Sequence, residues 1–106
     1  MRKIEQQLFL AIRTGTDWKS GNTSVAHEAD GRFSVRLHGN EIARGTPKAV
    51  RLFDCGWQTV TTKSRMNAVL RAIDSPSRVY QTRGDWFLST VDGEREFQEG
   101  ICAYAS

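Results

Sequence analysis

The sequence of 106 residues predicts a single α+β domain, and three observations lead to this fold class. Apolar residues recur at helical spacing in two segments, 4–12 and 66–73. Short segments between and after them alternate apolar with polar side chains, as half-buried strands do, and they end at glycine-containing turns. A chain of this length can bury one hydrophobic core and is too short for two.

The N-terminal segment predicts a helix. Ile4, Leu8, Ala11 and Ile12 fall on one stripe of a helix with 3.6 residues per turn, and Gly15 suits a left-handed terminating position. A polar loop is expected to follow. Its Trp18 either holds this loop on the core or serves as an aromatic anchor for a partner.

A three-stranded antiparallel meander is expected next. With a three-residue loop at 29–31 and Gly31 in the left-handed region, one face of the first hairpin carries Thr23, Val25, His27, Phe33, Val35 and Leu37. This register also places Glu28 across from Arg32 on the solvent side, where opposite charges attract.

The second hairpin is expected to turn through Gly39 and Asn40. This turn would pair Leu37 with Ile42 inside and His38 with Glu41 outside. Segment 49–54 then continues the sheet after Pro47, with Val50 and Leu52 on one face and Arg51 and Phe53 on the other. The outward side chains of Arg36, His38 and Arg51 predict a basic sheet face.

The second helix is predicted to lie across this sheet. Met66, Val69, Leu70 and Ile73 follow the spacing of one helix face, and Asp74 to Pro76 end the helix. Thr61 or Thr62 is the expected N-cap, because a hydroxyl there accepts an unpaired backbone N–H.

The first turn of that helix predicts an anion site. Thr61 and Thr62 supply hydroxyls, and Lys63, Ser64 and Arg65 follow directly. A cation at the positive end of a helix costs roughly 0.3 to 1 kcal/mol, which a bound phosphate or carboxylate would remove. In the alternative, both cations extend into water and Asp54 supplies the compensating charge.

Trp57 precedes this turn, and two roles are open for it. It packs under the helix, or it stacks on a base or sugar whose phosphate the helix start holds.

The C-terminal third is predicted to form a β-hairpin or three strands. The segments 77–82 and 85–90 and the stretch 94–105 alternate around turn signals at Gly84 and Gly93. Trp86 and Phe87 are neighbours on one strand and cannot both face the core, so Trp86 is a further candidate anchor.

Charge and composition favour a binding function. Residues 32–71 hold eight basic side chains against two acidic ones, whereas residues 85–106 hold five acidic against one basic. This polarity suits a polyanion or an acidic protein surface. The apolar runs are too short to span a membrane, so a cytoplasmic location is expected. Cys55 and Cys102 lack the spacing of metal ligands, which indicates reduced, buried thiols.

An enzyme is not expected, and neither is a cofactor or a metal. The predicted register places His27 and His38 on opposite faces of the sheet, which argues against a shared metal or an acid–base pair. Ser64, His38 and Asp54 would make a hydrolytic triad on paper, but nothing in their spacing requires one.

Three segments, "GNTSV", "LHGNEIA" and "GWQTVTTKSRMNAVL", resemble a pattern in small accessory proteins of tailed bacteriophages. The resemblance covers about residues 18 to 73, and its last block is the most distinctive. It implies a phage accessory protein in the cytoplasm of an infected bacterium, and it brings no catalytic residues with it.

Two binding hypotheses follow. In the leading one, the protein inhibits or modulates a host nucleic-acid-handling or defence complex, as anti-CRISPR proteins do, with a host protein or nucleoprotein as its partner. In the alternative, the basic and aromatic residues bind DNA or RNA directly, and binding weakens with salt.

Overall fold

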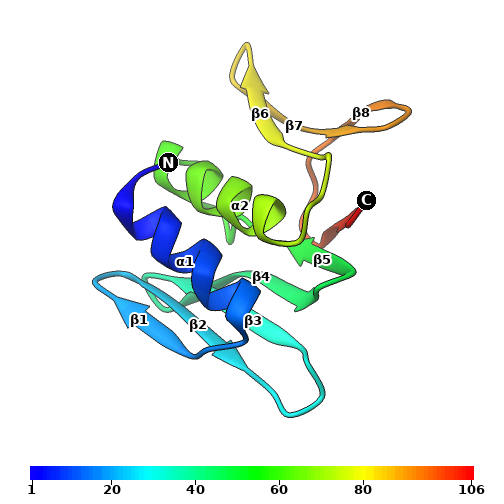
Figure 1. Ribbon diagram of the computed structural model, residues 1–106. Coiled ribbons are helices and arrows are strands. Elements are labelled where there is room, and N and C mark those ends of the chain that lie inside the picture. The colour runs from blue at the N-terminus through cyan, green and yellow to red at the C-terminus, as the bar shows by residue number, and fades with distance from the viewer.

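The computed structural model describes all 106 residues and has two helices and two antiparallel sheets (Figure 1). The α+β fold class is therefore confirmed. The elements are α1 (Lys3–Thr14), β1 (Trp18–Ser20), β2 (Thr23–His27), β3 (Phe33–Leu37), β4 (Asn40–Thr46), β5 (Ala49–Leu52), α2 (Val60–Ala72), β6 (Val79–Thr82), β7 (Asp85–Thr90), β8 (Gly93–Glu96) and β9 (Ile101–Tyr104).

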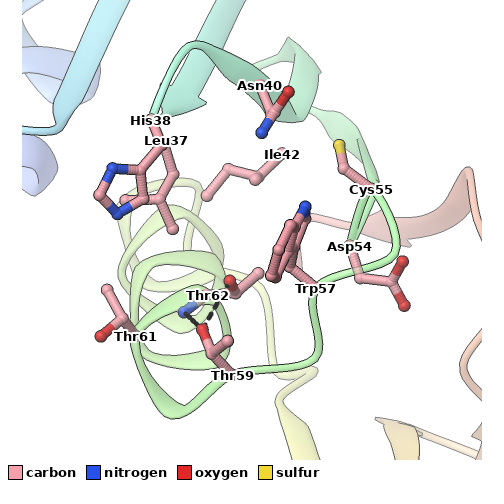
Figure 2. A pocket seen from close by; sticks show the side chains of 10 residues that line it. All are labelled: Leu37, His38, Asn40, Ile42, Asp54, Cys55, Trp57, Thr59, Thr61 and Thr62. Atoms are coloured by element: carbon pink, nitrogen blue, oxygen red, sulfur yellow. Dashed lines mark hydrogen bonds between the residues drawn. The ribbon is translucent and has the colours of Figure 1, made fainter.

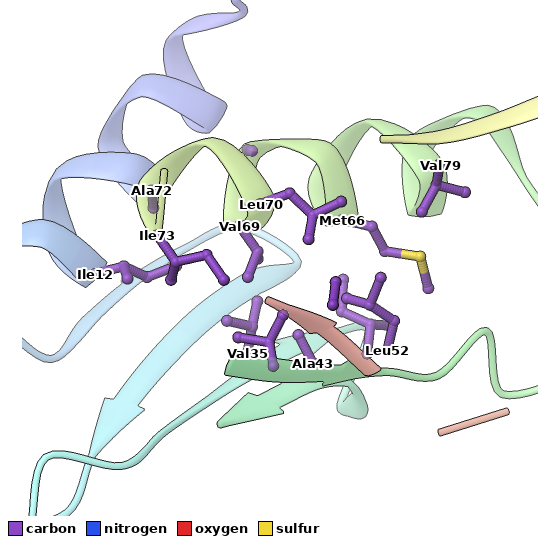
Figure 3. Packing of buried hydrophobic residues seen from close by; sticks show 14 of the residues in the cluster. Ile12, Val35, Ala43, Leu52, Met66, Val69, Leu70, Ala72, Ile73 and Val79 are labelled. Atoms are coloured by element: carbon purple, nitrogen blue, oxygen red, sulfur yellow. The ribbon is translucent and has the colours of Figure 1, made fainter. Parts of the chain in front are cut away.

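Both helices lie on one face of the main sheet (Figure 1). The core forms between the helices and the sheet (Figure 3). There, as their spacing predicts, Met66, Val69, Leu70 and Ile73 of the α2 region are at most 4% exposed. Each large apolar side chain buried in this way contributes about 1.5 to 3 kcal/mol relative to an exposed one. This packing fixes α2 against the sheet.

The first hairpin has the predicted register. Val25 pairs with Val35 and His27 with Phe33, and the three-residue loop ends at Gly31, whose φ is 91°. Arg32 forms an ion pair with Glu28 at 3.3 Å across the loop.

The second hairpin differs from the prediction by a shift of register. Its turn is His38–Gly39, with φ angles of 52° and 80°, so that Leu37 pairs with Asn40 and Arg36 with Glu41. Left-handed φ at both central residues is typical of a type I′ turn, whose twist matches the flanking strands. A β-bulge at Val35/Arg36 then places Ala43 opposite Val35, and His38, which lies in the turn, does not pair with Glu41.

The main sheet has six strands, in the order β1-β2-β3-β4-β5-β9, rather than the three of the predicted meander. The polar loop expected after the first helix contains β1, because Trp18 pairs with Val25 and packs against the core. At the other edge, β9 pairs with β5.

The predicted last C-terminal strand is divided in two. β8 joins β6 and β7 in a separate three-stranded sheet, and the chain then turns back so that Gly100 N–H donates to Leu52 O at 2.8 Å. β9 therefore belongs to the main sheet. The small sheet and the helices all lie on one side of the main sheet, and no helix or strand covers its opposite face (Figure 1). Neither helix is long and apolar enough to cross a bilayer.

Candidate functional site

Helix α2 begins earlier than predicted. Its N-cap is Thr59, whose hydroxyl oxygen accepts from Thr62 N–H at 3.1 Å, so neither Thr61 nor Thr62 is the cap. Lys63 is then the fourth helical residue and Arg65 the sixth. Because the field of a helix end decays within about one turn, Arg65 lies beyond the region that repels a cation.

Arg65 is not available to a ligand. It is 5% exposed, and its Nη1 lies 2.7 Å from Oε2 of Glu5 while its Nε donates to the Thr23 hydroxyl at 3.1 Å. The Ser64 hydroxyl donates to the same Glu5 carboxylate. The predicted anion site therefore loses Ser64 and Arg65, because an internal carboxylate neutralises them.

Burial of Glu5 acts to raise the pKa of its carboxyl group. Hydrogen bonds from Ser64 and from the Arg2 backbone N–H, together with the charge of Arg65, outweigh that effect and lower the pKa below its usual value. Glu5 is therefore ionised at neutral pH, and it is one half of a structural ion pair.

Lys63 has a structural role as well. Its ammonium group donates to Gln81 Oε1 at 3.3 Å and lies 5.8 Å from the centroid of the Trp86 ring. Trp86 is 3% exposed and packs edge-on against Phe97, so it cannot be the surface anchor that the sequence suggested. Trp18 is half-buried against the core, and its role is to hold β1 there.

Trp57 is exposed rather than packed under the helix. Its exposed fraction is 65%, and it forms one wall of an open pocket of about 450 Å³ (Figure 2). The pocket is lined by Leu37, His38, Asn40, Ile42, Asp54, Cys55, Trp57, Thr59, Thr61 and Thr62. This Trp57 pocket lies between the second hairpin and the start of α2, and it brings Thr61 and Thr62 together with Trp57.

A tight turn projects Trp57 outward. Cys55 and Gly56 have left-handed φ angles of 56° and 82°, and Gly56 N–H donates to Asp54 Oδ1 at 2.8 Å. The carboxylate of Glu99 accepts the backbone N–H groups of Asp54 and Cys55. Glu99 therefore fastens the turn that carries Trp57 to the segment before β9.

The ionisable groups that line this pocket are His38, Asp54 and Cys55. Partial desolvation of the sulfur and the charges of Glu99, Asp54 and Glu41 raise the pKa of the Cys55 thiol, so the reactive thiolate is scarce at neutral pH. Cys55 is exposed, contrary to the prediction of a buried thiol, and neither cysteine forms a disulfide. His38 and Asp54 line the pocket, but the Ser64 hydroxyl donates to Glu5 outside it. The three residues therefore do not form a triad.

The uncovered face of the main sheet is a second candidate site. We call it the outer basic face and define it by Lys19, Arg36, Arg44 and Arg51, which the strand register places on the side away from the helices. Arg36 and Arg51 lie where the sequence predicts. His38 lies in the turn beside this face rather than on a strand.

The cations of this face are largely unneutralised. Arg44 is directly opposite Arg51 on neighbouring strands. Arg44 lies 3.4 Å from Glu41 and stacks on Phe53, whereas Arg36 and Arg51 donate to the backbone oxygens of Gly39 and Gly100 and form no ion pair. Sequence reasoning missed Arg44. Counting back from the turn at Pro47 and Lys48, which pairs Thr46 with Ala49, would have found it.

A protein-family model described as Kyanoviridae Gp96 protein matches residues 1–104. No curated protein and no solved structure matches the chain.

Proposed function

Because the chain belongs to the Kyanoviridae Gp96 protein family, a phage family, we propose that it is a non-catalytic accessory protein that binds nucleic acid in the infected bacterium. The outer basic face is the binding surface. When a nucleic-acid strand is bound on this face, the protein competes for that strand with host nucleic-acid-handling or defence complexes.

The observation that carries this proposal is the direct pairing of Arg44 with Arg51. Like charges opposite each other on neighbouring strands destabilise a sheet, by roughly 0.2 to 1 kcal/mol. The chain supplies one carboxylate to Arg44 and none to Arg51. Phosphates on a bound strand would neutralise both arginines and would release counterions in doing so.

The rest of the face favours nucleic acid over a protein partner. Between the cations it carries small or polar side chains such as Ser24, Ala26 and Ser34, and its apolar Phe53 lies against Arg44 rather than in an apolar cluster typical of a protein interface. Tyr104, 64% exposed at the end of β9, offers a ring on which a base can stack.

A host protein as the direct partner is the second candidate, and one observation favours it. Trp57 and Val60 are 65% and 66% exposed at the start of α2, and exposed aromatic residues are typical centres of protein interfaces. On this alternative the protein inhibits the host complex by contact.

The test measures binding to single-stranded and duplex oligonucleotides over a range of salt concentrations. We expect log K to fall with log salt by about 0.7 to 0.9 per phosphate contact, and Arg44→Glu with Arg51→Glu to weaken binding at every salt concentration. Lys3→Glu with Arg71→Glu makes the same charge change at exposed positions on the helical side and is the matched control. Equal losses in both double variants, or binding indifferent to salt, would refute the proposal.

Affinity capture from nuclease-treated lysate distinguishes direct contact with a host protein from nucleic-acid binding. A partner retained without nucleic acid and lost with Val60→Glu would support contact with a host protein. Capture that disappears after nuclease treatment supports nucleic acid.

A further inference from the structure

A second pocket opens at the tips of the β1–β2 and β3–β4 hairpins. It has a volume of about 540 Å³, and all its lining residues are polar or glycine: Lys19, Gly21, Asn22, Thr23, Ser24, Arg36, His38 and Gly39. No carboxylate lines it. We call it the hairpin pocket, and its chemistry is that of an anion site.

The two cations of the hairpin pocket can converge on one anion. Lys19 pairs with Ser24, which pairs with Arg36, so the cations occupy one row with a hydroxyl between them. Two strand spacings separate their backbones by about 10 Å, which two long side chains directed toward each other can bridge through a phosphate.

Neither cation is neutralised within the protein. Lys19 and Arg36 form no ion pair. Glu41, which is opposite Arg36 on β4, accepts instead from Ser34 at 2.6 Å and from Arg44 at 3.4 Å. The positive potential of the pocket is therefore available to a ligand.

His38 connects the hairpin pocket with the Trp57 pocket, and it is the one residue that lines both. Its backbone N–H donates to Asn22 O at 2.8 Å, which ties the two hairpins together and fixes the wall between the pockets. Figure 2 shows the His38 ring on the opposite side of the Trp57 pocket from the indole. The hairpin pocket contains cations of the outer face and the Trp57 pocket lies on the helical side, so a ligand that fills both must pass around the end of the β3–β4 hairpin at His38.

The two pockets select different chemistry. Leu37 and Ile42 give the Trp57 pocket apolar walls beside the exposed indole, as a planar ring requires. Asp54 also lines it. Its carboxylate is turned away from the cavity and accepts from Gly56 N–H and the Gln58 amide (Figure 2). No lysine or arginine lines this pocket, so it holds no permanent counter-charge for an anion. The anionic part of a ligand therefore enters the hairpin pocket.

We infer that the paired pockets bind one nucleotide, with its base against Trp57, its phosphate between Lys19 and Arg36, and its sugar across His38. This inference rests on the proposed nucleic-acid function and deepens it, because it names the unit that is held. The nucleotide is either free or part of a strand.

The test is calorimetric titration, together with tryptophan fluorescence, using nucleoside 5′-monophosphates, the matching nucleosides and inorganic phosphate. We expect the monophosphate to bind more tightly than either part alone. Trp57→Ala, and separately Lys19→Gln with Arg36→Gln, should each weaken it at least about fivefold. These side chains are exposed, so the variants keep the fold. Lys3→Gln with Arg71→Gln, at exposed positions on the helical side, leaves both pockets intact and is the control, with affinity for the monophosphate unchanged within about twofold.

The outcomes separate this inference from the proposed function. Absence of monophosphate binding, or affinity indifferent to both pocket variants, overturns the paired site, while oligonucleotide binding that depends on Arg44 and Arg51 leaves the proposed function standing. Competition between an oligonucleotide and the monophosphate identifies a nucleotide within a strand. Monophosphate binding without any oligonucleotide binding supports the site with a free nucleotide and overturns the proposed function.

Discussion

The Glu5 carboxylate lies 2.7 Å from Nη1 of Arg65, and this ion pair joins α1 to α2 inside the protein. Both side chains are about 5% exposed, and Ser64 and Thr23 complete the hydrogen bonding. Arg65, which the sequence suggests as a binding residue, therefore serves to hold the two helices together.

Removing one partner of this ion pair should destabilise the fold. Arg65→Met leaves Glu5 buried without its counter-charge, and we expect the free energy of unfolding to fall by about 3 to 5 kcal/mol. Adding Glu5→Leu should restore much of this loss, because it removes the uncompensated charge. Urea unfolding of both single variants and the double variant measures the coupling. A loss below about 1 kcal/mol for Arg65→Met would show that the pair is solvated.

The two tryptophans near α2 should respond differently to truncation. Trp86→Ala opens a cavity in the core and should cost about 3 to 5 kcal/mol, whereas Trp57→Ala at an exposed position should change stability by no more than about 0.5 kcal/mol. Denaturation followed by circular dichroism gives both values. Equal losses would mean that Trp57 is covered in solution.

Glu99 should make stability depend on pH. Burial and the nearby Asp54 carboxylate raise the pKa of Glu99 above its usual 4.5, despite backbone N–H bonds that act to lower it. The folded protein therefore takes up this proton at a higher pH than the unfolded chain, and stability rises as pH falls through the folded pKa toward 4.5.

Glu99→Gln imitates the protonated group and removes its titration. We expect the stability advantage of the variant over the wild type to be largest near neutral pH and to shrink as pH falls toward 4.5. Unfolding free energies of both proteins, measured across that range, test this. A difference that does not vary with pH would show that Glu99 titrates normally.

Arg51→Glu should stabilise the protein while it weakens nucleic-acid binding. A carboxylate opposite Arg44 replaces repulsion with attraction, and we expect a gain of up to about 1 kcal/mol that declines as salt is added. Thermal unfolding at low and high salt measures this gain. A loss of stability would show that the bond from Arg51 to Gly100 O outweighs the repulsion.

Local patterns in the sequence determine the helices and the first hairpin of this protein. The apolar spacing of Met66, Val69, Leu70 and Ile73 places α2 on the sheet, and alternation around the loop at 29–31 sets the β2–β3 register. These features depend on side-chain periodicity within one element or between neighbours along the chain, which a single sequence contains.

Contacts between residues far apart in the chain decide the rest. Glu5 neutralises Arg65, which is 60 positions away in the sequence. Glu99 holds the turn that exposes Trp57, and β9, at the C-terminal end of the chain, pairs with β5. Spacing along the sequence says nothing of such partners. Arg65, which has no nearby acidic partner in the sequence, is therefore buried in an ion pair, and the uncompensated positive charge lies on the uncovered face of the sheet, where Arg44 is opposite Arg51.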